Sequence, residues 1–261
     1  MSVGHYENFP VASWLLPARL RRPVALLYRF AREADDFADE GNDAPEMRLK
    51  RLDGFRHQLE RPETAFFEDL KGMIAENQLC VQLFRDLLDA FSQDVTKGRY
   101  ANIAEVLGYC RRSANPIGRL LLQLFREDSP GNAKFSDSIC TSLQLINFWQ
   151  DVPIDYAKGR LYLPQDEMAR FQVSDAQIAE QRCDTHFQGL MRFQIRRARE
   201  MMLAGAPLAS ELGGRISLEI RTTIQGGLRI LEKLESSGCD MFRHRPVLRW
   251  FDWPLLLARA L

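Results

Sequence analysis

The sequence has 261 residues, which is enough for one large hydrophobic core or at most two ordinary domains. Apolar residues make up 46% and charged residues 27%, a balance that excludes a disordered chain. The formal net charge is zero, so we expect no nucleic-acid partner, and any anion-binding site must come from a local arrangement of charges.

The N-terminal segment holds one short apolar run, which Pro17 and Arg19 interrupt. The arginines of this segment come after the run. A secretory signal has its positive charge before the apolar run, and no stretch approaches the roughly 20 apolar residues of a membrane span. The five cysteines are odd in number and include no Cys-x-x-Cys pair, which argues against disulfides and structural zinc. We therefore expect a cytoplasmic protein with reduced cysteines.

Helical periodicity dominates the rest of the chain. The first helix is predicted from Pro23 to about Glu40, where Gly41-Asn42-Asp43 ends it. Further helices are predicted at about 46–60, 77–92, 102–126, 136–157, 175–204 and 211–236. We find no β-alternation and no internal repeat, so the simplest architecture is one all-α domain over residues 1–261.

The C-terminal segment WFDWPLLLARAL is apolar and aromatic. One interpretation is a tail that docks on the core. The other is a transient contact with a bilayer surface, which would place the protein at the periphery of the inner membrane. The segment alone leaves both interpretations open.

The first predicted helix carries the acidic motif Asp35-Asp36-x-x-Asp39. Asp35 and Asp39 are four residues apart, so on a helix they lie on the same face, one turn from each other. Like charges at that spacing repel each other and add nothing to the stability of the helix. Arg32 precedes Asp35 by one turn and offsets part of the repulsion.

A second stripe of short polar side chains lies near residue 150. Steps of three, four and four residues place its members on one helical face: Gln144, Asn147, Asp151 and Asp155. Pro153 interrupts the stripe and is predicted to kink the helix, because it removes a backbone hydrogen bond. Lys158 and Arg160 follow in the next loop.

Two facing acidic helices would suit magnesium, which is held by a few carboxylates together with substrate phosphate. The alternative is that each motif is a solvated helix face. Solvated faces usually carry longer Glu and Lys side chains, whereas the second stripe is flanked by bulky apolar residues. We therefore expect magnesium-assisted binding of a phosphate group.

Four segments resemble signatures of the squalene/phytoene synthase family. YRFAREADDFADE (28–40) is similar to the first signature, and QLINFWQDVPIDYAKGRLYLP (144–164) is similar to the second. YCRRSANPIGRLLLQLF (109–125) lies where the family has its Tyr-Cys and Gly stretch, and HYENFP (5–10) resembles the opening segment. The resemblance covers nearly the whole chain and implies a helical isoprenoid-synthase bundle around a deep central apolar cavity.

The resemblance also implies residue roles. Two or more Mg²⁺ ions would hold the substrate diphosphate. Asp35 and Asp39, supported by Asp36, would bind these ions from one wall. The facing wall would contribute Asn147, Asp151 and Asp155. Tyr28 and Arg32 match catalytic positions beside the first motif, and the residues expected to contact the substrate are His5, Asn8, Phe9, Arg32, Gln144, Lys158 and Arg160.

HYENFPVASWLLP and CRRSANP look most like the bacterial hydroxysqualene synthases of hopanoid synthesis. Those enzymes convert presqualene diphosphate and water to hydroxysqualene and diphosphate, so the resemblance implies no need for NADPH. A functional partner would be the enzyme that makes presqualene diphosphate. The rival within the family is a head-to-head synthase that condenses two farnesyl diphosphates. A non-catalytic scaffold is disfavoured, because the motif aspartates are all present.

Arg112 and Asn115 depart from the family pattern, since many relatives have small apolar residues there. Their hydrogen-bonding groups are candidates for positioning the attacking water. The alternative is that Arg112 faces solvent and Asn115 only precedes a proline turn.

Overall fold

The structure is a computed structural model, and it describes residues 17–39, 41 and 43–261. These residues form helices and loops without a strand, and one isolated bridge joins Arg99 to Leu161. The prediction of an all-α fold is therefore confirmed. The helices are α1 (Ala18–Asp39), α2 (Pro45–Glu60), α3 (Ala65–Glu76), α4 (Val81–Thr96), α5 (Ile103–Ser113), α6 (Asn115–Phe125), α7 (Pro130–Gln150), α8 (Val152–Ala157), α9 (Gln165–Arg170), α10 (Asp175–Ala179), α11 (Thr185–Gly205), α12 (Leu208–Glu211), α13 (Gly214–Ser236), η1 (Trp250–Asp252) and α14 (Trp253–Ala260).

Three of the predicted helices are each two helices in the structure. The helix predicted at 102–126 divides at Ala114, and Pro116 begins α6, where proline is tolerated because the first turn needs no backbone N–H donor. The helix predicted at 136–157 divides at Asp151, so Pro153 marks the start of α8 and the expected kink is a complete break. The helix predicted at 175–204 is divided into α10 and α11, and the Asp184 carboxylate caps α11.

Helix α3 was missed by the periodicity analysis. The Thr64 hydroxyl caps its N-terminus by accepting a hydrogen bond from the Phe67 amide at 3.5 Å. Its buried side chains, Phe67, Leu70 and Met73, cover the end of the α1–α2 pair. Such a short amphipathic segment gives a weak helical signal in the sequence.

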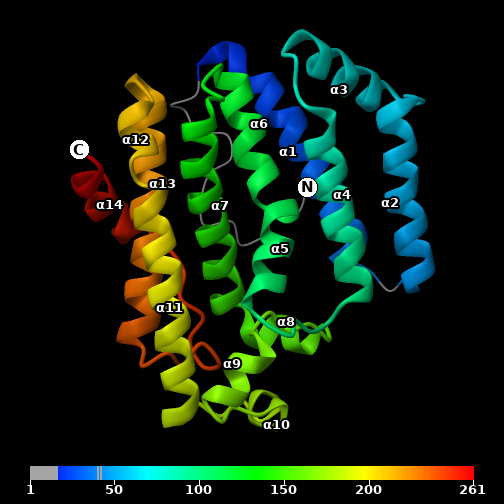
Figure 1. Cartoon of the computed structure of the whole chain (residues 1–261). Coiled ribbons are helices and arrows are strands. Elements are labelled where there is room, and N and C mark those ends of the chain that lie inside the picture. The colour runs from blue at the N-terminus through cyan, green and yellow to red at the C-terminus, as the bar shows by residue number, and fades with distance from the viewer. Residues whose placement is uncertain (1–16, 40, 42) are drawn as a thin grey trace.

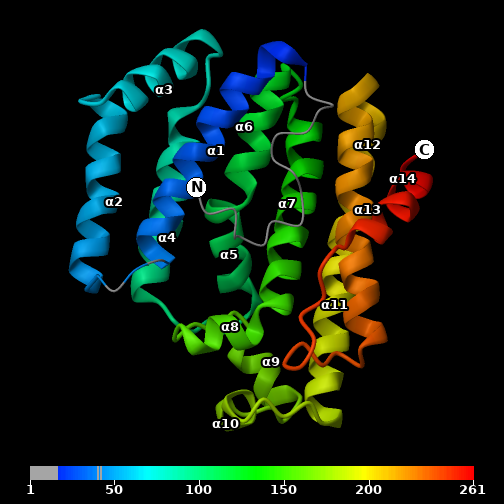
Figure 2. The same cartoon turned by 180° about the vertical axis from the view of Figure 1, so that it is seen from behind.

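The helices pack around two neighbouring hydrophobic clusters. One cluster contains side chains of α1, α2, α3, α4 and α6. The other contains mainly side chains of α5, α7, α11 and α13. In Figures 1 and 2, α2 and α3 lie on one side of the molecule and α11 to α14 on the other, while α8, α9 and α10 close one end. Helices α1 and α7 therefore lie in the interior, where their polar residues can face each other.

Helices α6 and α7 approach closely at Gly118. A Cβ atom there would lie 2.3 Å from the Ser136 hydroxyl and 2.6 Å from the Cys140 sulfur. A side chain at this position would therefore require Ser136 and Cys140 to move. The glycine is needed for the packing distance and not for an unusual backbone conformation.

The C-terminal segment docks on α13, as one of the two interpretations predicted. Leu256 and Ala260 of α14 are buried, and Arg221 of α13 donates a hydrogen bond to the Ala260 carbonyl at 3.4 Å. No helix within the described ranges is long and apolar enough to cross a bilayer.

Candidate active site

Both acidic motifs face one polar pocket of about 130 Å³. Asp35 and Asp39 enter it from α1, and Asp155 enters it from α8. The α7 side contributes Gln144, Asn147 and Asp151. The fold therefore brings together two polar stripes that are more than a hundred residues apart in the sequence.

Two arginines neutralise part of this negative charge. Arg160 binds Asp39 in a bidentate pair, with N–O distances of 2.5 and 3.0 Å, and Lys158 lies 3.3 Å from the same carboxylate. Arg245 binds Asp151 in the same way, also at 2.5 and 3.0 Å. Planar guanidinium groups suit carboxylates and phosphates equally well, so both arginines are placed to interact with an anionic ligand.

Arg32 lies beside the first motif. Its guanidinium is 2.8 Å from Asp36 and 4.0 Å from Asp35. Asp36 is paired with Arg32 and is not among the described residues that line the pocket. Arg32 is not among the described lining residues either, and its contacts with Asp35 and Asp36 reduce the repulsion between the first-motif carboxylates.

The negative charges of Asp35 and Asp155 are poorly compensated by neighbouring cations. Desolvation, followed by the charge of Asp39, raises the pKa of Asp35 to about 7. Desolvation raises the pKa of Asp155 to about 8, and the neighbouring charge of Asp151 adds to this effect. Desolvation acts on Asp39 too, but the hydrogen bond and charge of Arg160 outweigh it, so the pKa of Asp39 is lowered. The pocket therefore has unsatisfied negative charge at Asp35 and Asp155 and favours a cation.

Three polar residues of the pocket were not predicted from the sequence as site residues: Asp94, Tyr109 and Tyr162. Asp94 accepts hydrogen bonds from both phenols, and the distance from Tyr162 is 2.9 Å. Burial raises the pKa of Asp94 to about 6 despite these bonds, and it raises the pKa values of both phenols, which remain protonated donors. The signal that could have indicated Asp94 was its position one turn after Phe91 on the core face of α4.

Arg245 was also missed. It lies in the loop after α13, and 94 residues separate it from its partner Asp151. No local pattern in the sequence links the two. Only the tertiary fold brings this loop to the pocket, where Gln150 anchors it by donating a hydrogen bond to the Pro246 carbonyl at 2.6 Å.

An aromatic wall adjoins the carboxylates. The Phe148 and Tyr162 rings stack with centroids 3.7 Å apart and an interplanar angle of 6°. Tyr109 packs against both rings at centroid distances below 6 Å. This wall keeps one side of the polar pocket apolar and gives it π faces that can attract a cation.

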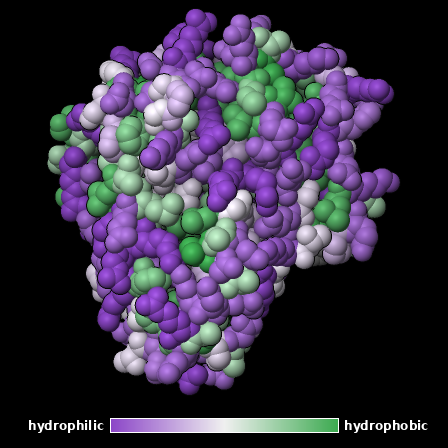
Figure 3. Space-filling view, viewed as in Figure 1, coloured by the Kyte–Doolittle hydropathy of each residue, from purple (hydrophilic) through white to green (hydrophobic). Residues whose placement is uncertain are grey.

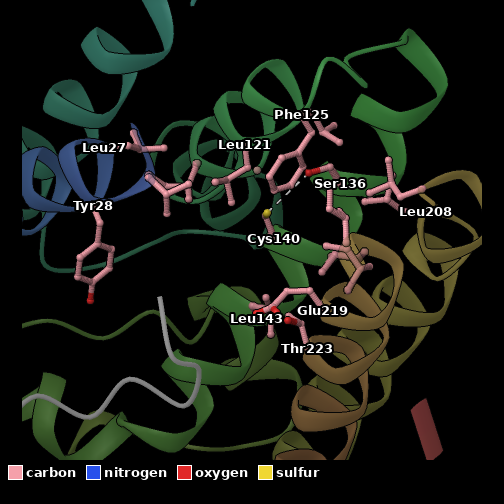
Figure 4. A pocket seen from close by; sticks show the side chains of 18 of the residues that line it. Leu27, Tyr28, Leu121, Phe125, Ser136, Cys140, Leu143, Leu208, Glu219 and Thr223 are labelled. Carbon is pink, nitrogen blue, oxygen red and sulfur yellow. Dashed lines mark hydrogen bonds between the residues drawn. The ribbon is translucent and has the colours of Figure 1, made fainter. Parts of the chain in front are cut away.

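The structure also contains an apolar cavity of about 300 Å³ (Figure 4). Helices α1, α6, α7, α12 and α13 line it, mostly with aliphatic side chains. Tyr28 points into it from α1, and Glu219 and Thr223 reach it from α13. The prediction of an apolar cavity agrees with this structure, and Tyr28 belongs to the cavity, not to the carboxylate pocket.

The cavity and the polar pocket share two helices. On α1, Tyr28 lines the cavity and Asp35 lines the polar pocket, about 10 Å further along the helix. On α7, Leu143 lines the cavity and its neighbour Gln144 lines the polar pocket. The charged pocket and the apolar cavity thus lie along the same two helices.

The other predicted residues lie elsewhere. Arg112 donates a hydrogen bond to Gln93 at 2.5 Å, and Asn115 accepts one from Thr141 at 2.9 Å. Neither is among the described residues lining the pocket or the cavity, so their role in positioning water stays a prediction that the geometry does not support. His5, Asn8 and Phe9 lie outside the described residues.

A preformed metal cage is not part of this pocket. Within the ranges that the structure describes, no three His, Cys, Asp or Glu side chains lie close enough to hold one ion together. The donors are nevertheless all carboxylate and amide oxygens, and desolvation and repulsion raise the pKa values of Asp35 and Asp155. This set fits Mg²⁺ that takes one or two ligands from the protein and the rest from phosphate and water.

The sequence profile of the family described as Squalene/phytoene synthase matches residues 3–252. The chain belongs to the squalene/phytoene synthase family. The resemblance of its motifs is thereby confirmed, and the two facing acidic stripes of this family member occupy one pocket.

Two similar curated proteins are hydroxysqualene synthases. That of Sinorhizobium fredii is 33% identical over 88% of this chain and 80% of its own length. That of Rhodopseudomonas palustris is also 33% identical over the same shares. Family membership and these relatives support an enzyme with a synthase activity of the squalene or hydroxysqualene type.

Two solved structures of synthases have a similar fold. The squalene synthase HpnC from Alicyclobacillus acidocaldarius superposes with a TM-score of 0.84 at 31% identity, covering 90% of each chain. A dehydrosqualene synthase superposes with a TM-score of 0.78 at 20% identity, covering 94% of this chain and 87% of its own, and supports the fold alone.

Proposed function

We propose that this enzyme converts presqualene diphosphate and water to hydroxysqualene and diphosphate. The observation that carries the proposal is that α1 and α7 each line both a charged pocket and an apolar cavity. A prenyl diphosphate has this same division into a charged head and an apolar chain. Two similar relatives are named hydroxysqualene synthases, and these names support this reaction over others in the family.

The charged pocket would bind the diphosphate. We propose two or more Mg²⁺ ions held by Asp35, Asp39, Asn147, Asp151 and Asp155; when bound, they would neutralise the leaving diphosphate. Arg160 and Arg245 would exchange part of their carboxylate contacts for phosphate oxygens. Arg32 and Lys158 add positive charge beside the aspartates, and Gln144 provides an amide to the pocket wall.

The apolar cavity would hold the carbocation that forms when the C–O bond to diphosphate breaks. Aliphatic walls exclude bulk water from it, and the Phe148–Tyr162 stack lines the charged pocket, where the cation first forms. Aromatic faces attract cations by roughly 0.5–2 kcal/mol each. The reaction therefore proceeds away from solvent until one selected water attacks.

The cavity itself contains few groups that could position this water. Tyr28, Ser136, Glu219 and Thr223 carry oxygen atoms on its lining, and Glu219 and Thr223 lie one turn apart on α13. In the proposed step, the water oxygen forms the new C–O bond and passes a proton to the Glu219 carboxylate. These residues are better placed for that role than Arg112 and Asn115, which lie outside the lining.

Product analysis with synthetic presqualene diphosphate tests the proposal. With Mg²⁺ and without a nicotinamide cofactor, we expect hydroxysqualene and diphosphate in equal amounts. A condensation product from farnesyl diphosphate alone, with no turnover of presqualene diphosphate, would support the rival head-to-head synthase instead. A requirement for NADPH would contradict the proposed water-quenched reaction.

A further inference from the structure

The C-terminal unit η1–α14 exposes apolar side chains on its outer surface. Trp250 is 82% exposed, Phe251 50%, Leu257 45% and Leu261 89%. Leu255 is exposed too, while the inward-facing Leu256 and Ala260 pack on α13. A helix that only covers the core would have polar residues on its outer side, and here the outer side is nearly as apolar as the inner one.

The surface forms one patch. Trp250 and Phe251 are in contact, with ring centroids 5.9 Å apart, and α14 follows them directly. In Figure 3, apolar atoms gather at the left edge of the molecule, where Figure 1 shows α14. We define the outer surface patch as Trp250, Phe251, Leu255, Leu257 and Leu261.

One exposed arginine adjoins the outer surface patch. Of the four arginines in residues 241–261, Arg243, Arg245 and Arg259 are paired with acidic residues, and the acidic Asp252 is buried and paired with Arg229 and Lys233. Arg249 precedes Trp250, is exposed and makes no ion pair with the described residues. The nearby Glu232 is paired with Arg229 and Arg259. The patch thus combines exposed aromatic rings with the adjacent Arg249, a chemistry that suits an anionic lipid surface.

We propose that the outer surface patch docks this enzyme on an anionic lipid bilayer. Helix α13 links the patch to the site, because Ile220 lines the apolar cavity and the adjacent Arg221 contacts α14. The role of this docking rests on the proposed function, because the apolar substrate and product would be exchanged with a membrane near the cavity. The lipid contact itself does not depend on which reaction the enzyme catalyses.

Flotation of the full chain with vesicles tests the docking. We expect binding to phosphatidylcholine vesicles that contain phosphatidylglycerol and weaker binding to phosphatidylcholine alone. The double variant Trp250→Ser/Phe251→Ser should reduce the bound fraction about tenfold, and Arg249→Gln should weaken only the binding to anionic vesicles. The matched control is Met47→Ser, an exposed apolar residue of α2 on the other side of the molecule, which should bind like the wild type.

Three outcomes would overturn the proposal: no vesicle binding by the wild type, full binding by the double variant, or equal loss in the Met47→Ser control. A concentration-dependent dimer that the double variant abolishes, without vesicle binding, would assign the patch to a second copy instead. Turnover of detergent-dispersed presqualene diphosphate separates the two proposals. Vesicle binding without turnover would refute the reaction and leave the docking intact, and turnover without binding would do the reverse.

Discussion

Substitution of Asp94 by asparagine offers a direct test of the electrostatics of the pocket. The folded protein raises the pKa of Asp94 to about 6, mainly because the carboxyl is buried. A folded-state pKa above the unfolded value means that the native state binds the proton more tightly. The ionised carboxylate therefore costs stability, which is lost as the pH rises from about 4 to about 6 and stays constant above that.

The magnitude follows from the size of the shift. About two pKa units correspond to about 3 kcal/mol at neutral pH. Asparagine has the same shape and can both accept from one phenol and donate to the other, so the contacts with Tyr109 and Tyr162 need not be lost. We expect Asp94→Asn to be about 2–3 kcal/mol more stable than the wild type at about pH 7.5 and within about 1 kcal/mol of it at about pH 4.5.

Urea unfolding of both proteins in chelator, followed by circular dichroism at the two pH values, measures this difference. The control is Asp53→Asn, whose side chain is 75% exposed and which should change nothing at either pH. Equal destabilisation of Asp94→Asn at both pH values would refute the reasoning, because it would show that the hydrogen bonds to the phenols outweigh the cost of the buried charge.

Three further predictions concern activity. Asp35→Asn or Asp151→Asn should reduce Mg²⁺-dependent diphosphate release by at least about a hundredfold with an unchanged circular dichroism spectrum; full activity in either variant would remove that residue from the site. Arg245→Met leaves Asp151 without its bidentate partner, so KM for the diphosphate substrate should rise about tenfold, and a normal KM would argue against a diphosphate contact. Glu219→Gln should keep diphosphate release and lower the share of hydroxysqualene among the products by about tenfold; an unchanged product ratio in gas chromatography would exclude Glu219 as the proton acceptor.

The sequence alone was enough to predict the helical fold class, the family and the two acidic stripes. These follow from local spacing: Asp35 and Asp39 share a helix face whatever surrounds them, and so do Gln144 and Asn147. The breaks were harder to predict, because Pro116 and Pro153 are compatible both with a kink and with a new helix start.

Only the tertiary structure decided which residues from distant parts of the chain contact each other in the site. Arg245 reaches Asp151 across 94 residues, and the Asp94 carboxylate meets Tyr162 across 68. Arg112 and Asn115 looked like cavity residues in the sequence, but their hydrogen bonds lie outside it, while Glu219 and Thr223 line it. Helical periodicity specifies which side chains share a face of one helix; which faces meet is decided by how the helices pack, and that depends on contacts over the whole chain.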